Sequence, residues 1–146
     1  MTYKGKFSPR NPSKYRGDPT GIVYRSLWER QLFRWLDEQP FVESWSSEET
    51  VIPYRCRTDN RIHRYFVDVK MTFTDGRTFL IEVKPAKETQ PPQSRGRRTP
   101  RFIQEVMTYA KNTSKWEAAN QYAADRGWKF EVWTENTLKR LGIKIL

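Results

Sequence analysis

The chain has 146 residues and a mass of 17.5 kDa, which is the size of a single domain. Its 27 Lys and Arg residues outnumber 17 Asp and Glu residues, and the net charge of +10 indicates a polyanionic partner, with nucleic acid first among the candidates. One Cys and one His exclude an internal disulfide and nearly exclude a zinc centre. The first residues lack the apolar stretch of a signal peptide, and no apolar run is long enough to span a bilayer. We therefore expect a soluble intracellular protein without a membrane partner.

Residues 1–20 are basic and contain several prolines, which predicts an extended arm ahead of one domain over residues 21–146. Within this arm Asp18 is the single acidic residue. Two interpretations remain open, a solvated tail and an arm that contacts DNA phosphates. The basic residues of the arm are Lys4, Lys6, Arg10, Lys14 and Arg16.

The first predicted element is an amphipathic helix over Val23–Glu38, where apolar residues recur at helical spacing until Gln39-Pro40 ends the run. Residues 41–55 are predicted to form a loop followed by a short strand around Thr50–Tyr54, which Pro53 interrupts.

A β-hairpin is predicted for the runs Arg64–Phe73 and Arg77–Val83, which flank Thr74-Asp75-Gly76. A three-residue loop with a left-handed Gly76 places Asp68 opposite Glu82. A two-residue loop would scramble the apolar face, so the pairing of the two carboxylates follows from burial alone. On the buried face the same register pairs Val67 with Val83, Val69 with Ile81 and Met71 with Phe79.

The C-terminal half begins with a basic, proline-rich loop over residues 85–101, whose cationic residues include Arg95, Arg97, Arg98 and Arg101. Apolar residues again recur at helical spacing from Phe102 onward, which predicts a helix that Asn112-Thr113 interrupts. The remaining predicted elements are a second helix from a Ser114/Glu117 capping box to Asp125, a strand over Trp128–Val132, a helix over Glu135–Leu141 and an edge strand over Ile143–Leu146. The order of elements predicts a mixed α/β domain whose small central sheet is sandwiched by helices.

Asp68 and Glu82 are the strongest candidates for chemistry because they interrupt apolar strands at facing positions, where like charges repel. Lys84 shares the strand face of Glu82, but one ammonium leaves two carboxylates with net negative charge. A hard divalent cation such as Mg²⁺ compensates such a pair. The alternative is an ordinary salt bridge of these acids with Lys84 or Lys70 on an exposed face.

Glu29 is a third candidate with two readings. Ser26-Leu27-Trp28-Glu29 is a capping box, in which the Glu29 carboxylate would only tie down the start of the helix. Glu29 also shares a helical face with Leu32 and Leu36, which turns it toward the core, where an acid could act in catalysis. Spacing leaves these two roles about even.

Together these residues resemble the PD-(D/E)XK nuclease superfamily. Glu29 lies on a first helix, Asp68 ends Arg64-Tyr65-Phe66-Val67-Asp68, and Glu82 and Lys84 belong to Ile81-Glu82-Val83-Lys84-Pro85. The TnsA-type endonucleases are the most similar subgroup, because they share an early Ser-X-X-Glu helix and segments like Lys115-Trp116-Glu117-Ala118-Ala119 and Trp133-Thr134-Glu135. The similarity covers about residues 20–141, although Val67 replaces the proline that gives the superfamily its name, and the basic loop has no counterpart.

The resemblance implies a restriction-endonuclease-like core and metal-dependent hydrolysis of double-stranded DNA. Asp68, Glu82 and the Val83 carbonyl would hold Mg²⁺, for which Mn²⁺ would substitute. Glu29 would bind a second ion or position the attacking water, which Lys84 would orient or deprotonate. Arg64 and Lys70 are nearby candidates for phosphate contacts.

The resemblance also extends to phage-encoded nucleases. It implies a role in phage head completion or in processing packaged DNA ends, with phage head or portal-neck proteins as partners and the host cytoplasm and virion as locations. Two alternatives remain open, a non-catalytic DNA-binding protein of the head and a repair or junction nuclease. The basic arm and loop are expected to supply salt-dependent phosphate contacts, whereas His63 and Cys56 are expected to be structural.

Overall fold

The computed structural model describes residues 4–94 and 96–145. Its centre is a mixed sheet with strand order β3-β6-β7-β8. Strand β3 pairs antiparallel with β6, β6 antiparallel with β7, and β7 parallel with β8. The strands are β3 Val42–Ser47, β6 Val69–Phe73, β7 Thr78–Val83 and β8 Lys129–Trp133.

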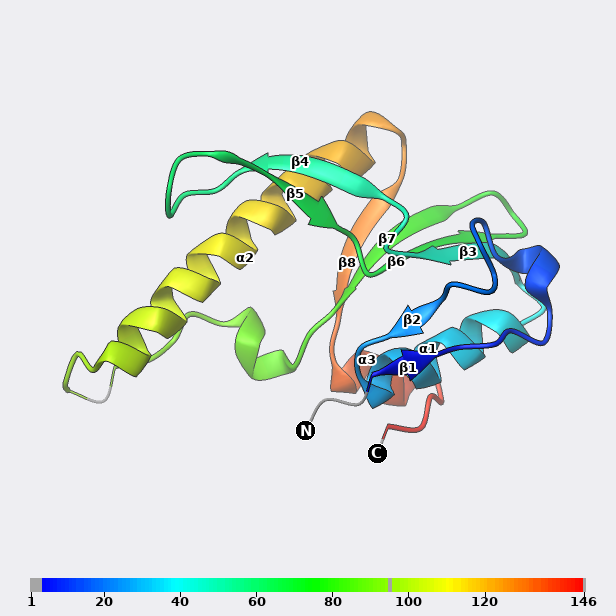
Figure 1. Cartoon of the computed structure of the whole chain (residues 1–146), viewed down its shortest axis with the longest axis horizontal. Helices are drawn as coiled ribbons and strands as arrows, with labels where there is room; N and C mark the ends of the chain where they lie inside the picture. Colours follow the sequence, from blue (N-terminus) through cyan, green and yellow to red (C-terminus); the bar gives the residue numbers. More distant parts are fainter. Residues whose placement is uncertain (1–3, 95, 146) are drawn as a thin grey trace.

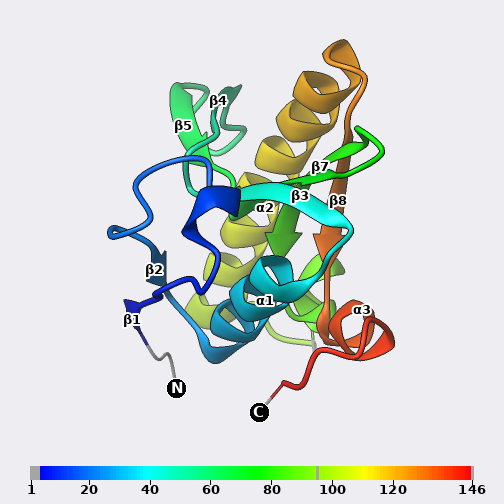
Figure 2. The same ribbon diagram turned by 90° about the vertical axis from the view of Figure 1, so that its right-hand side faces the viewer.

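Helices cover both faces of this sheet (Figures 1 and 2). On one face, α1 (Leu27–Glu38) and α3 (Glu135–Arg140) contribute Leu32, Leu36 and Leu138 to a buried apolar cluster. On the other face, α2 (Pro100–Asp125) packs Ala119 and Ala123 against the sheet. This arrangement confirms the predicted α/β sandwich.

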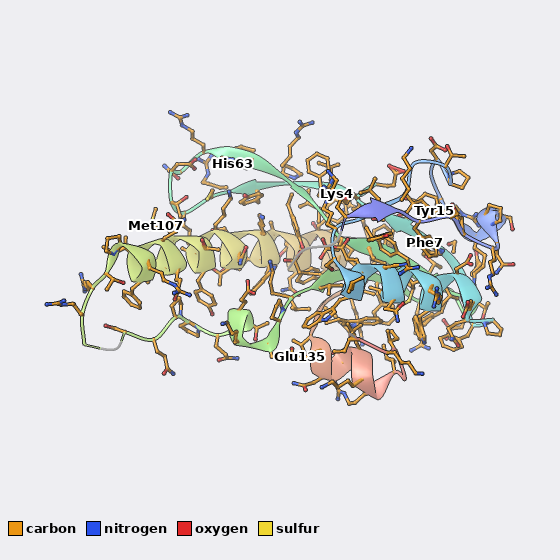
Figure 3. All side chains as sticks on the ribbon, turned by 60° about the horizontal axis from the view of Figure 1, so that its bottom comes forward. Lys4, Phe7, Tyr15, His63, Met107 and Glu135 are labelled. Atoms are coloured by element: carbon orange, nitrogen blue, oxygen red, sulfur yellow. The ribbon has the colours of Figure 1, made fainter. Side chains whose placement is uncertain are left out.

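A second hairpin, β4 (Val51–Arg55) and β5 (Ile62–Phe66), lies along α2 beside the main sheet (Figure 1). The chain then leaves β7 through a short 3-10 helix, η2 (Ala86–Thr89), before it enters α2. The N-terminal half of α2 extends past the sheet, so Ile103, Val106 and Met107 are exposed (Figure 3).

The register predicted for the β6–β7 hairpin is confirmed over the strands. Val69 pairs with Ile81 and Met71 with Phe79, and Gly76 has a φ of 92° in the turn. The predicted pairing of Val67 with Val83 is wrong, because the strand is broken at Val67 and Asp68. Val67 turns to the α2 side, and its N–H donates to the Thr50 carbonyl.

Residues 4–20 contain regular elements, so the prediction of an extended arm is wrong for this part of the chain. Strand β1 (Gly5–Lys6) pairs with β2 (Val23–Tyr24), so the predicted helix start at Val23 is also wrong, and α1 begins after its N-cap Ser26. A 3-10 helix, η1, spans Pro12–Lys14, with Pro12 at the first position, where its missing N–H costs nothing.

Aromatic side chains hold this N-terminal segment against the domain. The rings of Phe7 and Tyr15 lie edge-on to Trp45, with centroids 5.9 Å and 4.8 Å away (Figure 3). The Tyr15 hydroxyl donates to the Ser47 carbonyl at 3.2 Å and accepts from the Ser47 N–H at 3.1 Å. The segment is therefore part of the core despite its basic composition.

Replacing Tyr15 with alanine should lower the free energy of unfolding by about 3–5 kcal/mol, because a buried aromatic ring is lost. Replacing it with phenylalanine removes the two hydrogen bonds alone and should cost about 1–3 kcal/mol. Urea unfolding of both variants measures these values. A cost below about 1 kcal/mol for alanine would mean that the segment does not pack against the domain in solution.

Two further sequence predictions are wrong for local reasons. Residues 42–47 are predicted to be loop but form strand β3, because their backbone pairs with β6 and Val42 and Trp45 are buried in the core. At the C-terminus, Ile143 packs into the core, but residues 143–145 form no strand, and residue 146 lies outside the described residues.

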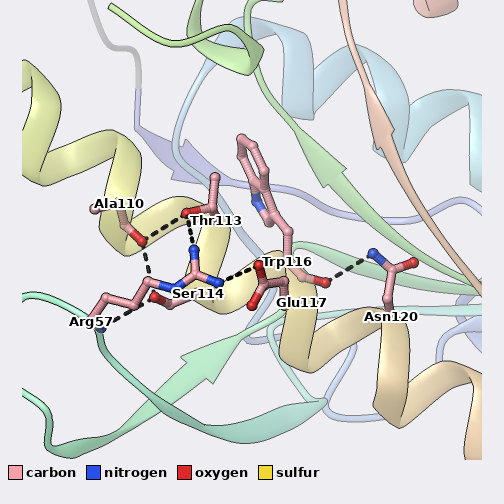
Figure 4. Close-up of polar contacts among 7 residues, drawn as sticks. All are labelled: Arg57, Ala110, Thr113, Ser114, Trp116, Glu117 and Asn120. Atoms are coloured by element: carbon pink, nitrogen blue, oxygen red, sulfur yellow. Dashed lines mark hydrogen bonds and ion pairs between the residues drawn. The ribbon is translucent and has the colours of Figure 1, made fainter.

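Helix α2 is continuous, so the predicted break at Asn112-Thr113 and the Ser114 capping box are also wrong. The Ser114 hydroxyl donates to the Ala110 carbonyl at 3.0 Å and accepts from the Arg57 N–H at 3.2 Å. The Arg57 guanidinium contacts Thr113 and Glu117 (Figure 4). These residues join the helix to the β4–β5 turn instead of ending it.

Candidate active site

One pocket of about 320 Å³ brings together the four candidate catalytic residues. It lies where β6 begins and β7 ends, between the first turn of α1 and the middle of α2. Its lining is strongly polar and consists of Glu29, Arg64, Tyr65, Phe66, Asp68, Glu82, Val83, Lys84 and Lys115.

The strand break positions Asp68. Because β6 begins only at Val69, the Asp68 side chain can turn toward the end of β7, where its Oδ2 accepts from the Val83 N–H at 2.8 Å. This hydrogen bond fixes the carboxylate beside Glu82, which precedes Val83. The predicted cross-strand pairing of Asp68 with Glu82 is therefore wrong, because Asp68 lies outside β6, and a local backbone irregularity brings the two carboxylates into one pocket instead.

Glu82 is buried and held on both of its oxygens. The Tyr65 hydroxyl donates to Oε1 at 2.6 Å, and the Trp116 indole N–H donates to Oε2 at 3.4 Å. The Lys84 Nζ lies 3.5 Å from Oε2. Because the Glu82 side chain is only 7% exposed, the ion pair with Lys84 does not lie on an exposed face.

The pocket disfavours the charged forms of two of its carboxylates. Burial, followed by the negative charges of Glu82 and Glu29, raises the pKa of Asp68 well above its usual range. Burial also raises the pKa of Glu29, against a hydrogen bond from the Arg25 N–H. A hard divalent cation with oxygen ligands would stabilise the charged forms of these clustered, buried carboxylates. The donor set thus fits a metal ion of the Mg²⁺ type.

Glu29 combines both of its predicted positions. Its backbone N–H donates to the Ser26 hydroxyl at 3.2 Å, as the N-cap predicts, but its carboxylate accepts from the Arg25 N–H at 3.0 Å and not from the Ser26 N–H of a full capping box. The same side chain lines the acidic pocket. Capping and a place in the site are therefore compatible.

The predicted phosphate-contact residues of the N-terminal segment lie in different surroundings. The Lys14 ammonium donates to the carbonyls of Asp37 and Gln39, at 3.0 Å and 2.8 Å, and so satisfies the end of α1. The Arg16 guanidinium donates to the Ser13 carbonyl at 2.9 Å. Lys4, Lys6 and Arg10 are exposed.

The remaining cationic candidates divide between the pocket and the far end of α2. Arg64 lines the pocket, whereas the Lys70 ammonium lies 4.3 Å from the centre of the Trp128 ring and outside the pocket lining. Arg97 and Arg98 are exposed just before α2, where Arg101 in the first turn lies 3.4 Å from Glu105. Arg95 lies outside the described residues.

A second cluster of potential ligands lies in the β4–β5 turn. The Cys56, Asp59 and His63 ligand atoms lie within 4.8 Å of one another. Within the turn, a hydrogen bond of 2.7 Å joins His63 Nε2 and Asp59 Oδ2, and another of 3.0 Å joins Cys56 Sγ and the Thr58 hydroxyl. These contacts stabilise the β4–β5 turn, and none of the three residues lines the acidic pocket.

Sequence reasoning missed three residues of the pocket region, Tyr65, Trp116 and Lys115. The sequence pattern assigns none of these three residues a role in the site. A helical stripe through Asn112, Ala119 and Ala123 faces the sheet and could have placed residues 115 and 116 beside it. The erroneous helix break at residue 112 hid this stripe.

An α/β sandwich with two acids and a lysine at the open end of a β-hairpin, and a third acid on the preceding helix, defines a restriction-endonuclease-like nuclease. Residues 39–135, which include Asp68, Glu82 and Lys84, match the family model described as TnsA-like endonuclease N terminal. Over 148 residues the sequence is 48% identical to the head completion nuclease of Enterobacteria phage T4, covering 99% of both chains. The chain therefore belongs to the TnsA-like endonuclease family.

Within residues 4–94 and 96–145, no helix combines the length and the apolar character needed to cross a membrane.

Proposed function

We propose that this protein is a divalent-metal-dependent DNA endonuclease that acts in phage head completion. The observation that carries the proposal is the convergence of Glu29, Asp68, Glu82 and Lys84 on one pocket in a chain of net charge +10. Double-stranded DNA is its substrate, and the relative in phage T4 supports a place in head assembly. Phage head or portal-neck proteins would then be its partners, in the host cytoplasm and the virion.

Asp68, Glu82 and the Val83 carbonyl would hold Mg²⁺, or Mn²⁺ in its place. The Val83 N–H already points to Asp68, and in an extended strand the carbonyl of a residue lies on the same edge as its N–H. When bound, the metal would polarise the scissile phosphate and lower the pKa of a bound water.

The side chains around the metal position would have different roles in the reaction. Lys84, beside Glu82, would donate to the attacking water or to the developing charge on the phosphate. Glu29 lies across the pocket, where it would accept a hydrogen bond from that water or ligate a second ion. Tyr65 and Trp116 hold the Glu82 carboxylate in one orientation.

The test is plasmid cleavage by the purified full chain with Mg²⁺, with Mn²⁺ and with a chelator. We expect supercoiled DNA to become nicked or linear with either metal and to stay intact with the chelator. The absence of cleavage with both metals would contradict the endonuclease proposal. Detection of the chain in purified virions tests its place in the head, and its absence there would favour a nuclease that acts elsewhere.

Replacing Arg97 and Arg98 with glutamine should weaken DNA binding for all sequences, because exposed arginines supply phosphate contacts. Each lost contact should lower the slope of log K against log salt by about 0.9, measured with a labelled duplex and Ca²⁺. The matched control is the same double change at Lys139 and Arg140, which are exposed on α3. Equal slopes for both pairs would place the DNA surface elsewhere.

A further inference from the structure

Helix α2 brings a second lysine to the acidic pocket. Lys115 lines this pocket together with Asp68, Glu82 and Lys84, although about 30 residues of chain separate it from the hairpin that carries those residues. Its ammonium lies 5.6 Å from the centre of the Tyr65 ring. The hydroxyl of that same tyrosine donates to Glu82. The lysine therefore belongs to the wall of the site and not to the outer surface of the helix.

The two lysines of the pocket differ in their partners. Lys84 forms an ion pair with Glu82 at 3.5 Å. Among the described residues, Lys115 has no carboxylate within 4.0 Å, although the negative charges of Glu82 and Asp68 act on it. It is half-buried and has given up part of its hydration without a direct counterion. An anion that enters the pocket would supply the missing partner.

The position of Lys115 is fixed from the opposite side of the helix. Arg57 in the β4–β5 turn contacts Thr113, Ser114 and Glu117, which surround Lys115 in sequence (Figure 4). On the site-facing side, the neighbouring Trp116 donates to Glu82. These contacts set the rotation of α2, so the lysine is presented to the pocket before substrate arrives.

We propose that Lys115 is a further catalytic residue that binds an oxygen of the scissile phosphate from the α2 side, opposite Lys84. The inference rests on the proposed endonuclease function, since it assigns the residue to the substrate of that same pocket. Asp68 and Glu82 would hold the metal in this arrangement, which would leave the Lys115 ammonium to contact the phosphodiester directly. The phosphate would thus be bound by cations from two elements, the end of β7 and the middle of α2.

The experiment compares Lys115→Ala, Lys115→Arg and Lys111→Ala with the wild type in Mg²⁺-dependent plasmid cleavage. Lys111 is exposed one turn earlier on the same helix and is absent from the pocket lining, so it controls for the loss of one charge on α2. We expect Lys115→Ala to lower kcat about 10- to 100-fold, the effect of losing one charged hydrogen bond. Lys115→Arg should recover part of this loss, and Lys111→Ala should stay within about threefold of the wild type.

Two further measurements separate phosphate binding from a structural role. The melting temperature of Lys115→Ala should stay within about 2 °C of the wild type. Its half-maximal Mg²⁺ concentration should stay equal or fall, because a cation near the metal position has been removed. If the wild type is active and Lys115→Ala cleaves within twofold of its rate, the role of Lys115 is overturned while the endonuclease proposal stands. The same holds if Lys115→Arg cleaves no faster than Lys115→Ala. An inactive wild type would instead overturn the endonuclease proposal.

Discussion

Replacing Asp68 with asparagine should lower the rate of Mg²⁺-dependent DNA cleavage by about 10³-fold or more. The amide oxygen can still accept the Val83 hydrogen bond, so the fold is kept while the charge that would hold the cation is lost. A catalytic metal contributes several kcal/mol to transition-state stabilisation, and about 1.4 kcal/mol corresponds to a factor of ten. Plasmid nicking across a Mg²⁺ titration measures the effect.

The control for this variant is Asp125→Asn, which makes the same change at an exposed position in the last turn of α2. It should cleave at the wild-type rate. Cleavage by Asp68→Asn within about tenfold of the wild type would show that the Asp68 carboxylate is not an essential metal ligand.

The same Asp68→Asn protein should be more stable than the wild type at neutral pH when no divalent metal is present. Burial and the neighbouring acids raise the pKa of Asp68, so the folded state holds this proton more tightly than the unfolded chain. Wild-type stability therefore falls as the pH rises from the usual carboxyl range, about 4, through the raised value. The asparagine side chain does not titrate, so the variant does not lose stability in this way as the pH rises.

Thermal unfolding in a chelator measures this difference. The melting temperature of Asp68→Asn should exceed that of the wild type by at least about 2 °C at about pH 8, and the gap should shrink toward about pH 5. A constant gap at both pH values would contradict the assignment of the effect to the Asp68 proton. Added Mg²⁺ should raise the melting temperature of the wild type more than that of the variant.

Replacing Lys84 with alanine should have the second large effect, a loss in kcat of about 10²- to 10⁴-fold. The amine lies 3.5 Å from Glu82, where it would meet the attacking water or the charge that develops on the phosphate. Because its contribution belongs to the transition state, DNA binding in Ca²⁺ should change by less than about threefold.

Single-turnover cleavage and duplex binding by Lys84→Ala separate these two quantities. Lys129→Ala is the control, because it removes the same charge at an exposed position at the start of β8. If Lys84→Ala loses binding and cleavage in equal proportion, the lysine serves affinity alone and a different group must assist the reaction.

The hairpin that carries the site could be predicted from sequence because two local signals agree. Alternating apolar residues set the face of each strand, and Gly76 sets the length of the turn, so the register of Val69 with Ile81 follows without tertiary information. The break at Asp68 could not be predicted in this way. It depends on hydrogen bonds of Val67 and Asp68 to residues 48 and 50, which belong to a different part of the chain.

Tertiary contacts also decide the elements that sequence reasoning missed. Strand β3 is rich in serine and becomes a strand because the N-terminal segment covers it, with Tyr15 bonded to Ser47. The sequence Ser114-Lys115-Trp116-Glu117 reads as a helix start, yet Arg57 from the second hairpin uses the same polar groups within one continuous helix. Local propensity favours a break there, and long-range pairing overrides it.

Because α2 is continuous, it fixes the distance between the arginines near its first turn and the acidic pocket beside its middle. An unbroken α-helix rises 1.5 Å per residue, so the first turn with Arg101 lies about 21 Å along the axis from Lys115. That distance matches about six base pairs of B-form DNA. A duplex lying parallel to α2 would therefore need about six base pairs beyond the cleaved bond to touch both the acidic pocket and Arg101, and a shorter duplex end would reach the pocket alone.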